Sequence, residues 1–275
     1  MDQKPKESRP KSGLVFAAIV KLGPKFISLM AKLLKGLKVG KVTLAGASMA
    51  SYAYLFTWQF ALLIMVMLFI HESGHIWAMR KCGMKIRGIY FIPFVGGAAV
   101  AEPRDGQILS MTEEVFIAIM GPVWGLALTI VTAIAYAQTG NPIFAAAASW
   151  MALVNLFNLI PINPLDGGRI LVAIAKSIHA VLGLGVIAVS LLAMAYFSMK
   201  FGLGLLAFLV LIGAMELAFG IEALRNPKNQ VIKMRAGGIV GSIIIWGIVA
   251  GGLLLFMVLM SNEPGAKEAM DMLHG

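Results

Sequence analysis

The sequence is dominated by long apolar segments that follow one another with short connections. Hydrophobic residues make up 59% of the chain and charged residues only 13%, whereas a soluble domain usually carries about 25% charged residues. A helix that crosses a bilayer needs about 20 predominantly apolar residues. We therefore expect an all-α polytopic membrane protein with about six to seven transmembrane helices. The expected segments are residues 42–58, 59–79, 115–137, 143–160, 180–198, 202–222 and 238–260.

The basic residues are distributed unevenly among the connections between these segments. If the N-terminus is cytosolic, 21 of the 23 Lys and Arg residues fall on the cytosolic side, and only Lys200 and Lys267 fall on the other. Because basic loops tend to stay in the cytosol, this pattern predicts a multi-pass protein of the cell membrane with a cytosolic N-terminus. It also accounts for the net charge of +10 without a nucleic-acid partner.

A basic stripe marks the N-terminal segment. Lys21, Lys25, Lys32 and Lys35 recur every three or four residues around Ser28, so a helix would present them on one face that can lie on anionic lipids. A short membrane hairpin or a helix packed on the bundle is the alternative. The chain then divides into this basic cytosolic segment, a membrane core, an additional C-terminal transmembrane helix and a short polar tail, at residues 1–41, 42–225, 226–260 and 261–275.

Residues 88–103, GIYFIPFVGGAAVAEP, interrupt the helical pattern. β-Branched and aromatic residues flank Gly96 and Gly97, which is typical of a β-hairpin or of a re-entrant loop. The charge distribution places this segment near the cytosolic side of the membrane. An ordinary loop is the alternative.

Three ionisable side chains stand inside the apolar run QFALLIMVMLFIHESGHIWAMR, at His71, Glu72 and His75. On a helix, His71 and His75 lie one turn apart on the same face, where two imidazoles can bind a single Zn²⁺ ion. From the adjacent position Glu72 can act as a general base toward a water held by the metal. A polar helix face satisfied by neighbouring helices is the alternative, but an ionised carboxylate in the bilayer core costs about 2.5–3.5 kcal/mol, which favours a functional site.

A catalytic zinc site needs a third protein ligand. The pattern HExxHxxGxxH does not continue here, because Ala78 and Lys81 stand at its glycine and third histidine positions. Asp166, in NLFNLIPINPLDGGR, follows the expected helix at 143–160 and emerges at the membrane level of the two histidines. We expect Asp166 to be the third ligand, beside a glycine pair that allows tight packing and unusual φ angles. An N-cap for the helix that starts near Gly167 is the alternative.

The two motifs together resemble the site-2 protease family of intramembrane zinc metalloproteases (M50-type). HESGH is followed about ninety residues later by NLIPINPLDGGR, and GPVWGLAL at 121–128 is similar to the family's AGPxxN segment. The resemblance covers roughly residues 45–220. It implies that His71, His75 and Asp166 bind one zinc ion per chain and that Glu72 is the catalytic base.

The resemblance further implies an intramembrane metalloendopeptidase that cuts single-span transmembrane substrates, for regulated proteolysis or for clearance of membrane peptides. Asn158, the asparagine ahead of PxxPLDG, is a candidate for oxyanion or substrate binding, and a hydrogen bond to backbone at the helix end is its alternative. One departure is Gly125, which stands where the AGPxxN motif has asparagine. An inactive protein that binds membrane proteins and a metal transporter are the alternative functions. No role is assigned to Glu216.

Overall fold

The computed structural model describes residues 40–92, 96–202, 204–225 and 231–274. Within these ranges the chain forms nine helices and one pair of strands. The basic segment expected at 1–41 lies outside the described residues except for its last two positions. In chain order the elements are α2 (Gly40–Leu55), α3 (Trp58–Lys81), β1 (Lys85–Ile92), β2 (Gly96–Glu102), α4 (Met111–Thr139), α5 (Pro142–Asn158), α6 (Asp166–Ile178), α7 (Ala180–Phe201), α8 (Gly204–Arg225), α9 (Ala236–Ser261) and α10 (Ala266–His274).

Four of the described helices, α3, α4, α7 and α9, are long and apolar enough to cross a membrane, and α5 is apolar but shorter. Many large apolar side chains on these helices face outward. Val189 and Leu192 on α7 are 67% and 72% exposed, and Ile248 on α9 is 66% exposed. Such exposure suits a surface that lipid covers. The expectation of a mostly helical membrane protein is therefore confirmed.

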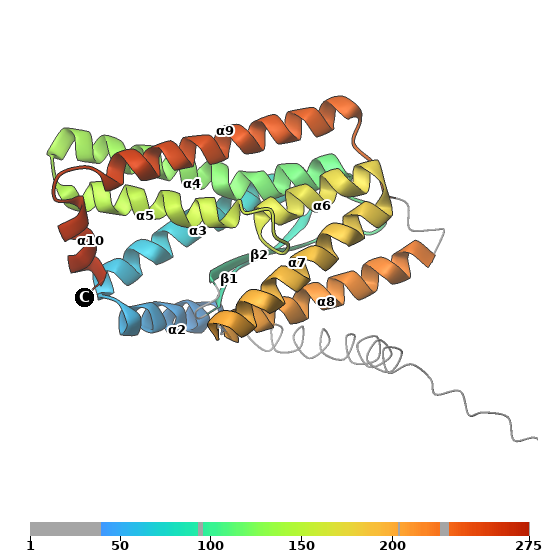
Figure 1. Ribbon diagram of the computed structural model, residues 1–275, viewed down its shortest axis with the longest axis horizontal. Helices are drawn as coiled ribbons and strands as arrows, with labels where there is room; N and C mark the ends of the chain where they lie inside the picture. Colours follow the sequence, from blue (N-terminus) through green and yellow to red (C-terminus); the bar gives the residue numbers. More distant parts are fainter. Residues whose placement is uncertain (1–39, 93–95, 203, 226–230, 275) are drawn as a thin grey trace, which may run out of the picture.

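The helices are arranged so that α5 and α6 follow one another end to end, with residues 159–165 as the break between them (Figure 1). Helix α4 runs beside both of them, and α9 packs on α4 and α5. Helices α7 and α8 pack on each other, and they join the rest through α6 and through Asn163 of the break, which bonds to Ser190 on α7 and Glu216 on α8. Within the break, Leu159 and Asn163 are buried in the bundle, whereas Ile160 and Pro161 are exposed.

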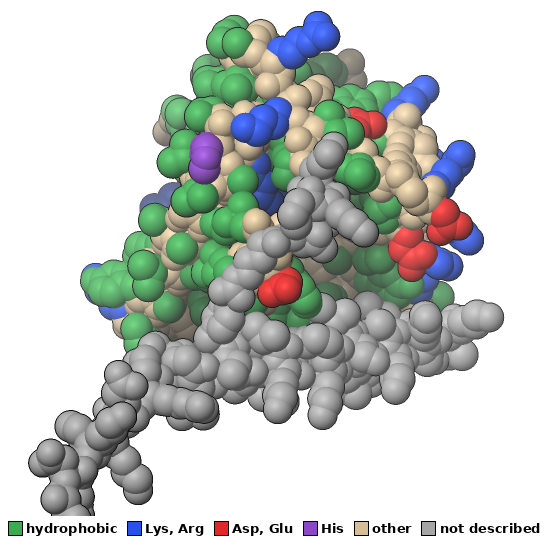
Figure 2. All heavy atoms as spheres, turned by 90° about the vertical axis from the view of Figure 1, so that its right-hand side faces the viewer, with side chains coloured by type: hydrophobic (Ala, Val, Ile, Leu, Met, Phe, Trp, Pro, Cys, Tyr) green, Lys and Arg blue, Asp and Glu red, His purple; other side chains and the backbone are tan. Residues whose placement is uncertain are grey.

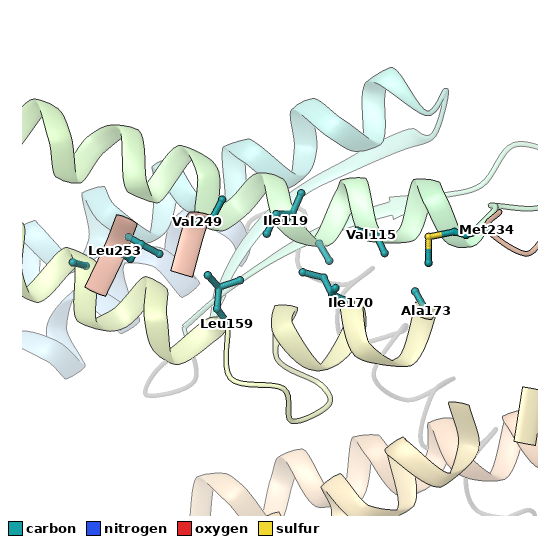
Figure 3. Close-up of a cluster of buried hydrophobic side chains, with 10 residues drawn as sticks. Val115, Ile119, Leu159, Ile170, Ala173, Met234, Val249 and Leu253 are labelled. Carbon is teal, nitrogen blue, oxygen red and sulfur yellow. The ribbon is translucent and has the colours of Figure 1, made fainter. Parts of the chain in front are cut away.

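One buried cluster holds the start of α6 in place (Figure 3). Ile170 on α6 packs with Val115 and Ile119 on α4, while Leu159 and Val249 close the cluster from the break and from α9. Because lipid tails are as apolar as these side chains, close packing rather than exclusion from water holds such helices together. Small residues assist this packing, and α5 buries five alanines, at 145, 146, 147, 148 and 152.

The segment at 88–103 forms the expected hairpin, which begins slightly earlier than predicted, at Lys85. Strands β1 and β2 are antiparallel, with Ile89 opposite Ala99 and Phe91 opposite Gly97. The hairpin packs against α3 through both strands and against α2 through β1. It is thereby brought beside the helix that carries the two histidines.

The chain after α9 contains a further helix. The predicted polar tail includes α10, which packs against the first part of α5. Tyr136 near the end of α4 donates a hydrogen bond from its hydroxyl to the Glu263 carboxylate, at 2.8 Å. The tail is therefore attached to the bundle at the end opposite to the start of α9 (Figure 1).

Candidate metal centre

Helix α3 carries the three ionisable residues of the HESGH motif into the interior. His71, Glu72 and His75 are 4%, 6% and 4% exposed. The helical spacing places both imidazoles on one face, with their Nε2 atoms 3.1 Å apart. Together these residues form a group whose ligand atoms lie within 4.8 Å of one another and which can hold a metal ion.

Asp166 joins the two histidines from the first residue of α6. Its Oδ2 atom lies 3.1 Å from His71 Nε2 and 3.3 Å from His75 Nε2. The N-cap of α6 is Leu165, which makes no side-chain capping hydrogen bond. The Asp166 carboxylate is therefore directed to the imidazoles and is not the cap of its helix.

The glycine pair after Asp166 brings the break and α6 together. A Cβ atom on Gly167 would collide with the backbone of Leu159, and one on Gly168 would collide with the backbone at Ile162 and Asn163. Both glycines belong to α6 and neither has a positive φ. The prediction of tight packing is confirmed, whereas the prediction of unusual φ angles is wrong, because the pair continues a regular helical turn.

Hydrogen bonds to the outer nitrogens fix the proton positions of both imidazoles. The Nδ1 atom of His75 lies 2.7 Å from the backbone oxygen of Ile117, which can only accept. The Nδ1 atom of His71 lies 2.8 Å from Oδ1 of Asn155, whose Nδ2 donates to the backbone oxygen of Met151 at 2.8 Å. Each Nδ1 therefore carries the hydrogen, and each Nε2 keeps its lone pair for a metal.

The resulting donor set fits a tetrahedral zinc ion. Two Nε2 lone pairs and the Asp166 Oδ2 converge at separations of 3.1–3.3 Å, where three acceptors repel one another unless a cation lies between them. Zinc bonds of about 2.0–2.1 Å imply an edge of about 3.3 Å between the ligands of a tetrahedron. The separations are therefore those that three zinc ligands require.

Glu72 lies beside this triangle and contacts the hairpin. Its Oε2 atom accepts a hydrogen bond from the backbone N–H of Ala99 in β2, at 2.7 Å. A Cβ atom on Gly97 would lie 2.6 Å from Cγ of Glu72, so the glycine leaves room for the carboxylate. The hairpin therefore fixes Glu72 next to the position that a metal would take.

A cavity of about 540 Å³ opens in front of these residues. The site lines its inner wall, residues 96–99 of β2 line one side, and the end of α5 lines another. Asn158, the residue predicted for oxyanion or substrate binding, is half-buried and lines the same cavity. Tyr52 of α2, Phe56 just after that helix and Leu209 of α8 also line the cavity.

Glycines of the GPVWG segment allow α4 to pass close to the site. A Cβ atom on Gly121 would collide with both imidazoles, and one on Gly125 would collide with the Asn155 side chain. On α3, Gly74 in turn leaves room for the Met120 backbone. The contact between Asn155 and His71 was not predicted, although a polar amide side chain inside an apolar helix could have indicated it.

A second polar group lies behind Asp166. Arg169 lies 3.5 Å from Glu114 and 3.9 Å from Oδ1 of Asp166, the carboxylate oxygen that faces away from the histidines. Asn163 in the break is buried and donates a hydrogen bond to Glu216 at 2.7 Å. Glu216, to which the sequence assigned no role, therefore holds the break against α8.

The fold and the site together define a membrane-embedded protein with an HExxH metal group. Residues 59–149, which contain that group, match the model of peptidase family M50. The family match ends before Asp166.

Two relatives match parts of the sequence. The chain is 30% identical over 169 residues to zinc metalloprotease MJ0392 of Methanocaldococcus jannaschii. This match covers 58% of this chain and 48% of the relative. It is 33% identical over 118 residues to Rip3 of Mycobacterium tuberculosis, and this match covers 40% of this chain and 29% of the relative. The matched regions thus span less than half the length of these relatives.

Proposed function

We propose that this protein is a zinc-dependent intramembrane endopeptidase that cuts transmembrane substrates. The observation that carries the proposal is the triangle of His71, His75 and Asp166 with Glu72 beside it, buried in a helical membrane protein. The name of the relative MJ0392, a zinc metalloprotease, supports the same activity.

The two Nε2 atoms and the Asp166 Oδ2 would hold one zinc ion per chain. When bound, zinc lowers the pKa of a water toward about 7 and polarises a carbonyl group. The hydrogen bonds from the histidine Nδ1 atoms to Asn155 and Ile117 orient the ligands for this role.

Glu72 acts as the proton carrier. Its carboxylate takes a proton from the attacking water and passes it to the amine of the departing peptide, a role that typically contributes 10²–10⁴-fold to the rate. The Ala99 N–H keeps the carboxylate in place without placing it among the three ligand atoms. Asn158 lines the cavity within the same site, and we propose it as a donor to the substrate or to the oxyanion.

The substrate is a single-span membrane protein whose helix unwinds locally. A helical peptide hides its carbonyl groups in backbone hydrogen bonds, so the scissile bond must be presented in an extended form. The outer edge of β2 supports this, because residues 96–99 line the cavity beside the site, where the Ala99 N–H is bonded to Glu72. A peptide added along this edge would cross the cavity in front of the site. Release of a regulator and clearance of membrane peptides both use this chemistry.

The proposed topology has six to seven spans, with the N-terminus and the active side in the cytosol. The distribution of 21 of the 23 basic residues supports it. Figure 2 views the end of the molecule where α6 and α8 end and α9 begins, and shows several Lys and Arg side chains there. His71 stands ten residues before the end of α3, or about 15 Å along the helix, so the site lies below this surface.

The two alternative functions receive less support. A transporter needs polar groups along a path through the membrane, yet among the described residues the buried ionisable side chains are His71, Glu72, His75 and Asp166, all at one site. An inactive binding protein would need neither the three candidate zinc ligands nor the carboxylate of Glu72 beside them, so this arrangement favours an enzyme.

Removal and return of the metal tests the proposal. The purified protein in proteoliposomes is given a panel of single-span peptides, and cleavage is followed by mass spectrometry before and after chelation. We expect cleavage to cease on chelation, to return with Zn²⁺ and not to return with Mg²⁺. Cleavage that continues at the same rate in the zinc-free protein would contradict the proposal.

A further inference from the structure

Asn155 of α5 contacts His71 but is not one of the three candidate metal ligands. Its side chain is 1% exposed, and its amide makes two hydrogen bonds in opposite directions. Nδ2 donates to the Met151 backbone oxygen, and Oδ1 lies 2.8 Å from Nδ1 of His71. A flipped amide would place two acceptors against each other at Met151, so the orientation is determined.

Gly125 on α4 lies directly against this amide. A Cβ atom built on Gly125 would have as its three nearest neighbours Oδ1, Cγ and Nδ2 of Asn155, all within colliding distance. The amide cannot move aside without breaking a bond to Met151 or to His71. A side chain at position 125 and the amide of residue 155 therefore exclude one another.

We infer that Asn155 is a positioning residue for the metal ligand His71, and that Gly125 provides the space for its amide. The inference rests on the proposed metal site, not on peptidase activity. The Oδ1 acceptor holds the hydrogen on Nδ1 of His71, turns the ring and leaves Nε2 free for the metal. Partners of this kind typically contribute 10–100-fold to metal affinity.

The arrangement explains a departure seen in the sequence. Position 125 is where the AGPxxN motif has asparagine, and a side chain there would grow into the volume that the Asn155 amide now fills. An asparagine at 125 combined with a small residue at 155 would thus bring an amide next to His71 from α4 instead of α5. The two positions form an exchangeable pair.

The acceptor role is tested by zinc affinity, measured by competition with a chromogenic chelator on purified, folded protein. We expect Asn155→Leu and Asn155→Ala to bind zinc 10–100-fold more weakly, and Asn155→Asp, which keeps an acceptor, to stay within a few-fold of the native protein. Ser149→Ala is the matched control, because Ser149 is also a buried polar residue of α5 and donates to the Met257 backbone far from the histidines. Its zinc affinity should be unchanged.

The exchange of the two positions provides a second test by the same measurement. Gly125→Asn alone should weaken zinc binding at least about tenfold, and Gly125→Asn combined with Asn155→Ala should bind more tightly than either single variant. Native affinity in Asn155→Leu would overturn the inference, as would equal losses in Asn155→Asp and Asn155→Leu. A double variant no better than Gly125→Asn would also overturn it. Zinc affinity that follows the expected pattern without any peptide cleavage would support this inference while contradicting the proposed function.

Discussion

The Nε2 atom of His71 and the Oδ2 atom of Asp166 lie 3.1 Å apart, although 95 residues separate them in the chain. The contact joins the second half of α3 to the first residue of α6, directly after the break between α5 and α6. No local pattern around either residue produces this contact. Helix α4 lies between α3 and α6 in the sequence and packs on both of them, so it holds the two helices together. The contact therefore depends on the whole core of the bundle.

Replacement of Asp166 should remove zinc from the protein. In Asp166→Ala the two histidines lose the third donor, so we expect zinc affinity to fall by at least about tenfold, with a substoichiometric metal content after purification. Atomic absorption on the purified protein measures this. Glu114→Gln is the control, because Glu114 contacts Arg169 and not the imidazoles. Full zinc occupancy in Asp166→Ala would exclude Asp166 as a ligand.

Addition of one methyl group at Gly121 should have a similar effect. The new Cβ atom would collide with the imidazoles of His71 and His75, so Gly121→Ala must separate α4 from α3 or turn the rings. We expect at least about a tenfold loss of zinc affinity. In Gly241→Ala on α9 the new Cβ meets no atom within 4 Å, and this variant should bind zinc like the native protein. Equal affinities in the two variants would be the contrary result.

Gly97→Ala should separate metal binding from catalysis. Its Cβ atom would press on Glu72 and displace the carboxylate from the Ala99 N–H, while the three ligand atoms are untouched. Zinc content should stay at one ion per chain, and the cleavage rate should fall by about 10-fold or more, since the proton carrier is misplaced. A variant that loses its zinc would show that Gly97 serves the metal ligands instead.

Cys82 reports both the topology and the local environment. It is the single cysteine of the chain and follows the end of α3. Burial, together with the Glu113 and Glu114 carboxylates, raises the pKa of its thiol. Because the thiolate is the reactive form, alkylation should be slow at pH 7 and should keep accelerating beyond the pKa of a free cysteine, about 8.5.

The side of the membrane on which Cys82 reacts tests the orientation. An impermeant maleimide should label inverted vesicles and leave right-side-out vesicles unlabelled, with detergent-opened vesicles as the control. Labelling of right-side-out vesicles alone would reverse the proposed topology.

Much of this arrangement could be predicted from the sequence, because its causes are local. The spacing of His71 and His75 follows from helical periodicity, and Gly96 and Gly97 within a β-branched run indicated the hairpin. Asp166 was predicted by elimination and by its expected membrane level, and the structure brings it to the two histidines.

Other features depend on contacts between distant segments and leave no local pattern. The hydrogen bond between Asn155 and His71 spans 84 positions, and no role was predicted for Asn155, while Asn158, three residues later, was considered for oxyanion or substrate binding. The glycines after Asp166 looked like positions of unusual backbone geometry, yet they are helical and serve close packing. The role of Gly125 depends on a side chain from another helix. Only the three-dimensional packing reveals such requirements.

In the proposed function, Glu72 carries the proton in a zinc-dependent cleavage of membrane peptides. The most direct measurement is the cleavage rate of the same single-span peptides by the native protein and by Glu72→Gln, both shown to contain one zinc ion per chain. We expect cleavage by the native protein and a rate at least about 100-fold lower in the variant, with zinc retained. Equal rates in the two proteins would contradict the role of Glu72 as proton carrier.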